Sequence, residues 1–582
     1  MPRLASMTPP IAPAADDRTA RRALFAAVVI SLGVSLIVVD ATIVGVLLPQ
    51  LVDDLGLSTA SAEWVTSVYA LVFAALLIPF GRAGDLFGRR RMIVLGVAVF
   101  TVASVLAALS TDSTSLIGAR ALQGVGASMV MPATLSTLNA MFTGKERAHA
   151  FGIWGATIAG MSALGPLVGG ALASGGTWRW AFGVNLVFGA ALIWGVLKVV
   201  PETRAATAGG RLGIDWPGAL LSAAAFGLLV CGIIEGPAFG WWTATRHVAA
   251  GGLSPIPLMI AAGLALLVVL VLVERARAAA GRPVMLDLTL FSVPSFRNGN
   301  LASALINVGE LGLLFVLPLF LLGVHGSAPL EISLAILPLA AGAFGSGAVA
   351  HVLANKYGPH RVVQGGMVLE VLAVLALAAT LSPTTGGLGL APWMLLYGLG
   401  LGLTSAQLTN VSLADVPPDR AGQASGTQST ARQIGAALGV AVIGTVFATT
   451  LGHAMSGRLD HEGLPAARRD AITRDLRHSA GTSARDLHRT PGMGEVARAA
   501  DASLADASRA GALATAVILA GGLLLSLRLR PSGASRSSRV ESDVESADAA
   551  DSAAVDAAPD TSSDAAGQGP SAGRAGTAAP EH

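Results

Sequence analysis

Five ionisable side chains stand out among those inside the long apolar stretches of this 582-residue sequence. They are three carboxylic acids and two guanidinium groups: Asp40, Glu310, Glu370, Arg120 and Arg432. A charged group in a low-dielectric medium is costly. Such groups therefore occur mainly where they pair with one another, bind a charged ligand or carry protons. These five residues are the first candidates for chemistry.

Asp40 and Arg120 are predicted to form an ion pair. Asp40 lies about 16 residues into the first apolar stretch, or ~24 Å along a helix. Arg120 lies near the start of the fourth stretch, which crosses the membrane in the opposite direction, so the two residues are predicted to lie at similar depth. Burial favours the neutral form of a carboxyl group, whereas a nearby guanidinium favours the charged form. A carboxyl group that moves between these two settings can take up and release a proton. We predict proton coupling here, with a static structural pair as the alternative.

The other three candidates leave more than one interpretation open. Glu310 lies in the middle of its stretch, where it could bind a proton or a cationic ligand, or remain a solvated carboxylate without a role. Glu370 is expected to be structural, and Arg432 either pairs with a carboxylate or lines a cavity. We carry Glu370 and Arg432 forward as candidate cavity residues.

The elements that carry these residues are predicted to be membrane helices. The chain is 53% hydrophobic and 13% charged, with a mean hydropathy of +0.65, which is too apolar for a soluble domain. Its apolar blocks are long enough to cross a ~30 Å hydrocarbon core, where the backbone must be helical. We therefore expect an all-α polytopic membrane protein. The fourteen predicted spans are 24–48, 63–81, 92–111, 115–141, 151–173, 180–198, 216–235, 256–273, 299–323, 331–353, 362–382, 391–411, 424–450 and 511–528.

The distribution of basic residues predicts the orientation. If the N-terminus is cytoplasmic, 19 Lys and Arg residues between Arg18 and Arg420 fall in the cytoplasmic segments, and the short outer loops hold only Arg179 and Arg246. Positive loops stay inside, so both termini are predicted to be cytoplasmic. Segment 452–510 is then external, and we expect an amphipathic or loosely helical loop. The tail 531–582 has almost no large apolar residues and is predicted to be disordered.

Two segments 270 residues apart resemble each other. Gly81-x3-Asp85-x2-Gly88 follows the second span, and His351-x3-Asn355-x2-Gly358 follows the tenth. Repeated halves are typical of secondary transporters, whose substrate site lies between the halves. The sequence GRAGDLFGRRR from Gly81 to Arg91 resembles the signature loop of the major facilitator superfamily.

Further motifs resemble the fourteen-span drug:proton antiporter branch of that superfamily. They are VDATIVGVLLP from Val39, RALQGVGASMVMPA from Arg120, GPLVGG from Gly165, WRWAFGVN from Trp178, DWPG from Asp215 and ARQIGAALGVAV from Ala431. The sequence departs from the pattern at Gly45, Leu86, Met161, His351 and Asn355.

The resemblance implies two six-helix bundles, 24–200 and 298–530, with two extra central helices in a linker, 201–297. A cytoplasmic segment, 1–23, precedes the bundles. The implied function is proton-coupled efflux of small amphipathic or cationic compounds by alternating access, in the plasma membrane of a bacterium. A dedicated exporter of one endogenous metabolite, or a non-transporting sensor or scaffold, are the alternatives.

The resemblance also assigns two groups of motif residues. The predicted gating loop comprises Gly81, Gly84, Asp85, Gly88, Arg89 and Arg90. Its carboxylate can accept hydrogen bonds from a helix N-terminus or from Arg, and such contacts would hold one end state; plain anchoring of topology is the alternative. The predicted antiporter motif comprises Gly155, Gly165, Pro166, Gly169 and Gly170. Ordinary helix packing is its alternative interpretation.

Several classes of function are not expected. A single cysteine, Cys231, cannot organise disulfides, and the sequence has no Walker A motif, catalytic triad or metal-ligand cluster. The basic residues lie at the ends of apolar blocks, which does not favour nucleic-acid binding. We expect no enzyme activity, cofactor or metal; the partners are a small-molecule substrate, protons and the lipid bilayer, and the working expectation is a monomer.

Overall fold

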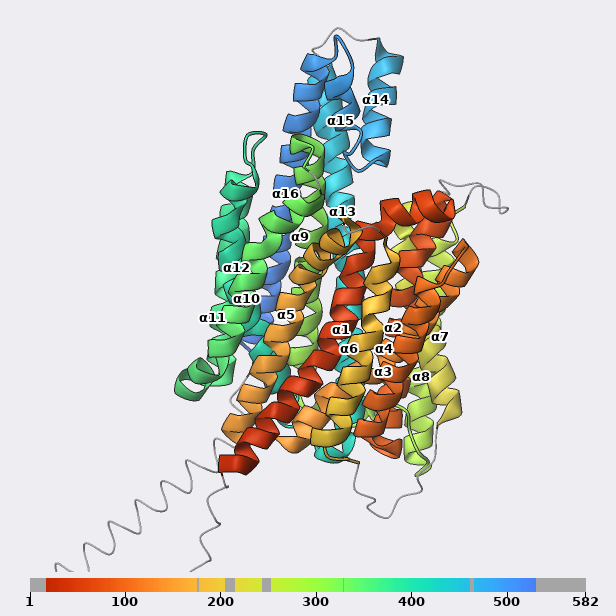
Figure 1. Ribbon diagram of the computed structural model, residues 1–582, viewed down its shortest axis with the longest axis vertical. Coiled ribbons are helices and arrows are strands. Elements are labelled where there is room, and N and C mark those ends of the chain that lie inside the picture. The colour runs from red at the N-terminus through yellow and green to blue at the C-terminus, as the bar shows by residue number, and fades with distance from the viewer. Residues whose placement is uncertain are drawn as a thin grey trace, which may run out of the picture. The chain divides into compact units, whose positions relative to one another are not determined.

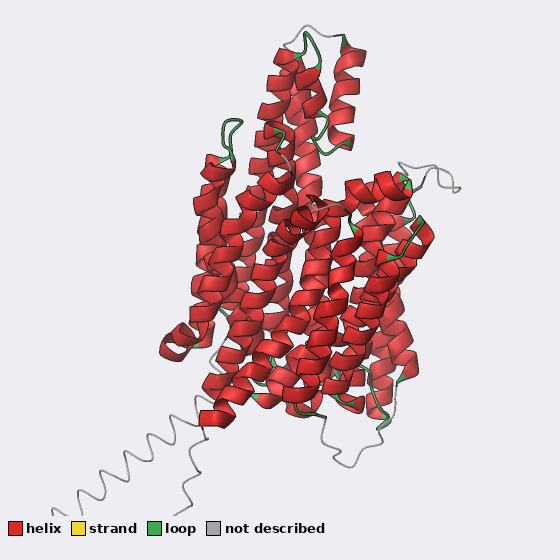
Figure 2. Ribbon diagram, viewed as in Figure 1, coloured by secondary structure: helices red, strands yellow, loops and turns green. Residues whose placement is uncertain are grey.

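A computed structural model describes residues 17–174, 177–204, 215–242, 253–327, 329–460 and 465–529. The predicted segment 1–23 lies mostly outside these ranges, and the predicted tail 531–582 lies wholly outside them. Within the described ranges every regular element is a helix (Figure 2), as expected for a chain that must satisfy its backbone hydrogen bonds inside a membrane.

The long helices of the first part of the chain are α1 (Asp17–Leu55), α2 (Thr59–Phe87), α3 (Arg89–Ala108), α4 (Ser113–Met141), α5 (Gly144–Ser174), α6 (Arg179–Val199), α7 (Trp216–Phe239) and α8 (Ile256–Ala279). The second part holds α9 (Pro294–His325), α10 (Pro329–Tyr357), α11 (Pro359–Thr380), α12 (Gly387–Ser412), α13 (Ala421–Leu459) and α16 (Gly494–Ser526). The shorter elements are η1 (Leu288–Ser292), η2 (Pro418–Arg420), α14 (Ala466–His478) and α15 (Ala484–Arg489).

The long helices belong to one compact unit (Figure 1), which is described below as a first half, a second half and the pair α7 and α8. In the first half, α1–α6, α3 packs on α4 and α6, and α1 packs on α5. In the second half, α9–α13 with α16, α12 packs on α10 and α11, and α9 packs on α13 and α16. One buried apolar cluster is formed mainly by the first half and another mainly by the second half, with a few residues of the opposite half in each. The predicted all-helical architecture is therefore confirmed.

The number of spans is a separate matter. Among the described residues, twelve helices are long and apolar enough to cross a membrane. The helices at the predicted spans 115–141 and 151–173 are not among these twelve; they are α4 and α5, which are 29 and 31 residues long. The polar residues Arg120 and Gln123 lower the hydropathy of α4. The predicted count of fourteen is thus not confirmed.

Segment 452–510 is more ordered than expected. The segment, predicted as an amphipathic or loosely helical loop, is helical over most of its length: α13 continues to Leu459, α14 and α15 follow, and α16 begins at Gly494. Apolar side chains of these helices, including Met455, Leu476 and Leu504, are buried in a common cluster. Charged and small residues are interspersed here, so the apolar residues that pack together were not recognised in the sequence. Its external location stays a prediction.

The two halves touch directly. Helix α2 packs on α13, and α5 packs on α10 and α12. A Cβ atom built on Gly81 of α2 would lie 2.4 Å from the carbonyl oxygen of Gly422 in α13. At this crossing the two backbones meet with no room for a side chain, a contact that only glycine allows.

Candidate functional site

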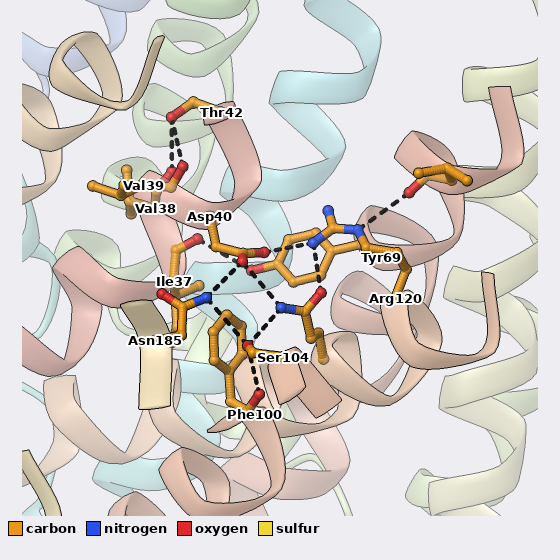
Figure 3. A network of polar contacts seen from close by, with 12 residues as sticks. Ile37, Val38, Val39, Asp40, Thr42, Tyr69, Phe100, Ser104, Arg120 and Asn185 are labelled. Carbon is orange, nitrogen blue, oxygen red and sulfur yellow. Dashed lines mark hydrogen bonds and ion pairs between the residues drawn. The ribbon is translucent and has the colours of Figure 1, made fainter. Parts of the chain in front are cut away.

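Asp40 lies at the centre of a buried polar network within the first half (Figure 3). Its Oδ2 atom pairs with Nη1 of Arg120, as the sequence predicted. Its Oδ1 atom accepts hydrogen bonds from Nδ2 of Asn185 and Nε2 of Gln123, each at 3.0 Å. The carboxylate is only 2% exposed, so these three donors replace the water that it has lost.

Three members of this network were not predicted as site residues. Gln123, Asn185 and Ser104 come from α4, α6 and α3, and Ser104 Oγ accepts hydrogen bonds from Gln123 at 2.8 Å and Asn185 at 3.2 Å. The sequence held a signal for two of them. Gln123 lies three residues after Arg120, hence on the same helix face, and Asn185 ends the motif that begins at Trp178. Ser104 has no such signal.

The motif that begins at Trp178 also fixes the C-terminal end of α1. Arg179 Nη1 and Trp178 Nε1 both donate to Oδ2 of Asp54, at 2.6 and 2.9 Å. The hydrogen bonds from Arg179 and Trp178 hold the pKa of the Asp54 carboxyl below its ordinary value. The motif thus ties α6 to α1 at two levels, Asp54 and Asp40.

The ring of Tyr69 separates this network from a cavity. The Arg120 guanidinium carbon lies 4.4 Å from the ring centroid, a cation–π contact. The Tyr69 hydroxyl donates to the Ile37 carbonyl at 3.3 Å. Tyr69 lines the cavity, whereas Asp40 and Arg120 do not.

The cavity has a volume of about 390 Å³ and is bounded by helices of both halves and by α7. Its walls are mainly apolar, with Phe73, Met131, Ile158 and Ile233 among the larger side chains. Such a chamber, with a few polar groups, is typical of a site for a small amphipathic molecule.

Glu310 and Arg432 are the charged residues among the side chains that line this cavity. They are 4% and 9% exposed, and they lie close enough to interact electrostatically. Glu370, the other candidate cavity residue, is fully buried in α11 and does not line the cavity. Its side chain lies at the crossing with α12, where a Cβ on Gly400 would be 2.8 Å from Glu370 Cγ.

Asp85, in the last turn of α2, joins the two halves of the molecule. Its Oδ1 and Oδ2 atoms accept the backbone N–H groups of Gly422 and Gln423, at 2.9 and 3.1 Å. These are the free N–H groups of the first turn of α13, where the helix dipole also favours a negative charge. We call these contacts, with those of Arg89 below, the Asp85 layer.

Arg89 completes the Asp85 layer. Its Nη2 atom donates to Asp85 Oδ1 at 2.8 Å and, across the halves, to the Pro418 carbonyl at 2.7 Å. Both side chains of this pair are 1% exposed. Gly88, at φ +108°, makes the turn that brings Arg89 back toward Asp85, a backbone angle that glycine adopts readily.

The remaining predicted loop residues have other contacts. The Arg90 backbone N–H donates to Glu202 Oε1 at 3.2 Å, so Arg90 belongs to the start of α3 and not to the contact between halves. A Cβ on Gly84 would meet only ordinary contacts, at 3.8 Å or more. Asp85, Arg89 and Gly81 are therefore the loop residues that touch the second half.

A second set of contacts between the halves lies at the start of α5. Arg147 donates to the side chain and the carbonyl of Asn410, at 3.1 and 2.9 Å. The rings of His149 in α5 and His351 in α10 are stacked, with centroids 3.9 Å apart and planes 6° apart. His351 occupies the first glycine position of the second repeat, so this repeat makes a different contact from that of Gly81. Asn355 is exposed.

The predicted antiporter motif places α5 between its neighbours. A Cβ on Gly155 would lie 2.5 Å from Ala406 of α12, and one on Gly165 would lie 1.8 Å from Thr42 Oγ1 of α1. Gly169 faces Ile43 of α1 in the same way. Pro166 and Gly170 also belong to α5. Substitution at Gly155 or Gly165 would force helices apart.

Among the described residues no group of three or more His, Cys, Asp or Glu side chains could hold a metal ion. The chemistry that the arrangement offers is therefore that of a buried, fully hydrogen-bonded carboxylate beside a cavity, and of a carboxylate bound to a helix N-terminus across two halves.

Known proteins resemble this chain in sequence and in fold. The profile of the Major Facilitator Superfamily matches residues 23–440. The puromycin resistance protein of Streptomyces alboniger is 34% identical over 79% of this chain and 88% of its own length. The multidrug efflux pump LfrA of Mycolicibacterium smegmatis is 34% identical over 74% and 82%. The tetracenomycin C resistance and export protein of Streptomyces glaucescens is 30% identical over 75% and 78%.

Among solved structures, the human organic anion transporter MFSD10 has a TM-score of 0.55 and 14% identity, covering 87% of this chain and 99% of that one. A bacterial homologue of the human lysosomal transporter Spinster has a TM-score of 0.50 and 19% identity, covering 87% and 98%. At these identities the likeness concerns the fold.

Proposed function

The chain belongs to the Major Facilitator Superfamily, and from that premise we propose that it exports small amphipathic or cationic compounds, such as antibiotics, in exchange for protons. Relatives named for puromycin resistance, multidrug efflux and tetracenomycin C export support the substrate class and the direction. We place the protein in a bacterial plasma membrane with both described ends cytoplasmic, on the distribution of Lys and Arg.

The observation that carries the proton part is the Asp40 network. A carboxylate that is 2% exposed has exchanged water for Arg120, Gln123 and Asn185, all from one half. Any shift of α4 or α6 against α1 removes donors and favours protonation of Asp40. Since Tyr69 lies between Arg120 and the cavity, a ligand that displaces the ring would disturb the same network. Proton uptake and ligand binding would then be linked.

The second step of the proposal is alternating access. The Asp85 layer closes the end at which α2 finishes and α13 begins, while the cavity lies further along both helices. This arrangement is that of a state closed toward the predicted cytoplasm. Opening breaks the bonds to Gly422, Gln423 and Pro418, and the cavity, which stays in place, becomes accessible from the predicted cytoplasm. The Asp85 layer is thus the proposed gate.

Uptake of puromycin or ethidium by everted vesicles tests this function. With an inward-acid pH gradient, vesicles holding the wild-type protein accumulate substrate, and a protonophore abolishes the accumulation. Asp40→Asn should lower it to the level of vesicles without the protein. Asp53→Asn, at an exposed acid on the same helix, is the matched control and should retain transport. Accumulation that persists unchanged with the protonophore, or in Asp40→Asn, contradicts proton coupling.

A dedicated exporter of one metabolite is the second candidate. It is favoured by relatives that are named for a single compound, puromycin or tetracenomycin C. A competition assay separates the two: structurally unrelated drugs inhibit uptake by a multidrug pump, whereas only close analogues inhibit a dedicated exporter.

A further inference from the structure

A second cavity of about 390 Å³ lies apart from the central one, between the added helix pair and the second half. It is bounded by α7, α8 and η1 on one side, and by α2, α9 and α13 on the other. Neither the Asp40 network nor the Asp85 layer reaches it, so the proposed transport cycle assigns it no role.

This cavity is apolar along its length and charged at one end. The residues that line it span 267–274 of α8, 297–304 of α9 and 427–434 of α13, a rise of ~10 Å on each helix. Leu267, Ala304 and Ile434 lie at the far end, and Glu274 and Arg297 lie at the near end. A ligand that fits this polarity has an apolar tail and one polar head.

The near end presents a cation to the ligand. Glu274 is 1% exposed, and both its oxygens accept the Met285 N–H, at 3.1 and 3.2 Å. Next to it, the buried Asp215 pairs with Arg277 at 2.9 Å, so each of these two acids already has a partner within the protein. Arg297, by contrast, is exposed and makes no side-chain hydrogen bond or ion pair within the described residues.

A buried acceptor in the wall is also without a partner. Asn300 is 5% exposed, and its Nδ2 atom donates to the Phe296 carbonyl at 2.7 Å, but its Oδ1 atom accepts no hydrogen bond among the described residues. A buried polar atom of this kind normally has a partner. The wall thus offers an acceptor for a ligand hydroxyl close to the Arg297 cation.

The mouth of the cavity faces the bilayer. Phe291 and Leu301 line it and are 37% and 51% exposed, and the adjoining face of α8 is also apolar and exposed, with Val268 at 60% and Leu272 at 59%. Exposed apolar side chains on a membrane helix contact lipid, so the nearest amphiphile is a phospholipid.

We propose that this cavity binds an anionic phospholipid, with an acyl chain along α8, α9 and α13 and the head-group phosphate on Arg297. A hydroxyl-bearing head group, such as that of phosphatidylglycerol, also supplies a donor for Asn300. Exposed Arg275 at the same end of α8 adds to the positive field that attracts such lipids. The lipid fills the gap between the added helix pair and the second half. This site does not depend on the proposed direction or energy source of transport.

Native mass spectrometry of the full-length protein tests the site. Wild-type protein, exchanged into detergent with phosphatidylglycerol, should retain one lipid that phosphatidylcholine does not replace. Arg297→Gln should weaken retention by about tenfold or more, as expected for a lost charged hydrogen bond. Leu301→Trp should weaken it by obstructing the mouth. Arg282→Gln, an exposed cation at the same end that does not line the cavity, is the matched control and should behave as wild type.

Three outcomes overturn the proposal. The first is equal loss of lipid in Arg297→Gln and Arg282→Gln, since the effect is then general surface charge. The second is displacement of the lipid by inorganic phosphate alone, which would make the acyl chain irrelevant. The third is protection of the cavity from a photoreactive lipid by a transported dye, which would make it a substrate site. Circular dichroism confirms that each variant is folded. Arg297→Gln changes the charged end of the site, whereas Leu301→Trp obstructs its mouth.

Discussion

The guanidinium carbon of Arg120 lies 4.4 Å from the ring centroid of Tyr69, and the same ring forms part of the wall of the central cavity. Arg120 is thereby covered on the side of the cavity, while its Nη1 atom holds Asp40 on the other side. One aromatic ring separates the candidate substrate space from the candidate proton site. This relationship leads to the first prediction.

Tyr69→Ala should open a proton leak. Without the ring, water in the cavity reaches Arg120 and Asp40, so proteoliposomes in an acidic medium should acidify inside faster than wild type in the absence of substrate. A pH-sensitive dye inside the vesicles measures this. Tyr69→Phe keeps the ring and loses only the bond to the Ile37 carbonyl, so it should stay tight. A tight Tyr69→Ala variant would rule out the barrier role of the ring.

Asn185→Leu should shift the pH profile of transport to higher pH. Asn185 donates to Oδ1 of Asp40 at 3.0 Å, and a donor to a carboxylate favours its charged form. Without this bond the carboxylate of Asp40 has one donor fewer, and stability should fall by about 1–3 kcal/mol because a buried acceptor loses a partner. Initial uptake rates from pH 5 to 9 provide the profile. Asn139→Leu, at a buried asparagine outside the network, should leave the profile in place.

Gly81→Ala should destabilise the Asp85 layer. The new Cβ atom would lie 2.4 Å from the Gly422 carbonyl oxygen, a backbone atom that moves only if α2 and α13 separate. Gly84→Ala in the same loop meets nothing closer than 3.8 Å and is the matched control. A cysteine at the fully buried Ser425, in a Cys231→Ser background, reports opening through labelling by a thiol reagent. Labelling should rise in Gly81→Ala only; equal labelling in both variants would contradict the gate.

The His149–His351 stack should make the closed state sensitive to pH. Two imidazoles with centroids 3.9 Å apart repel one another when both are protonated, and burial together with the neighbouring His351 lowers the pKa of His149, so this repulsion arises only at acidic pH. Labelling at the Ser425→Cys probe should therefore rise with falling pH in wild type. His351→Phe keeps an aromatic ring in the stack without a charge and should remove that dependence, whereas His360→Phe should keep it. A pH response that is unchanged in His351→Phe would exclude the stack as its cause.

The sequence predicted the charged pair and the loop but not their surroundings. Asp40 and Arg120 could be paired because helix rise and direction fix depth in a membrane, even for residues 80 positions apart. The partners of Asp85 could not be predicted in the same way. They are backbone N–H groups of Gly422 and Gln423, and a backbone group leaves no mark in the side-chain pattern. Ser104 was missed because a lone serine in a membrane helix is common and usually bonds its own backbone.

The position of the Glu370 side chain shows a further limit of prediction from the sequence. Periodicity places an acid within a span, but it does not tell whether the helix turns that acid toward a cavity or toward a neighbouring helix. Gly400 of α12 decides the matter, because its missing side chain makes the space that the Glu370 side chain occupies. This contact involves two helices, so the sequence of neither helix alone could predict it.

Leu504→Ala should destabilise the helical extension formed from segment 452–510. Leu504 of α16 is fully buried, and it contacts Gly481 and Gly323, which connects the extension to α9. Loss of a buried leucine side chain typically costs about 2–5 kcal/mol. Hydrogen exchange of residues 466–489 should accelerate accordingly. Leu513→Ala, on the same helix but 45% exposed, should change it by less than about 0.5 kcal/mol. If both variants exchange alike, the extension is not held by this cluster, and a loose loop becomes the better description.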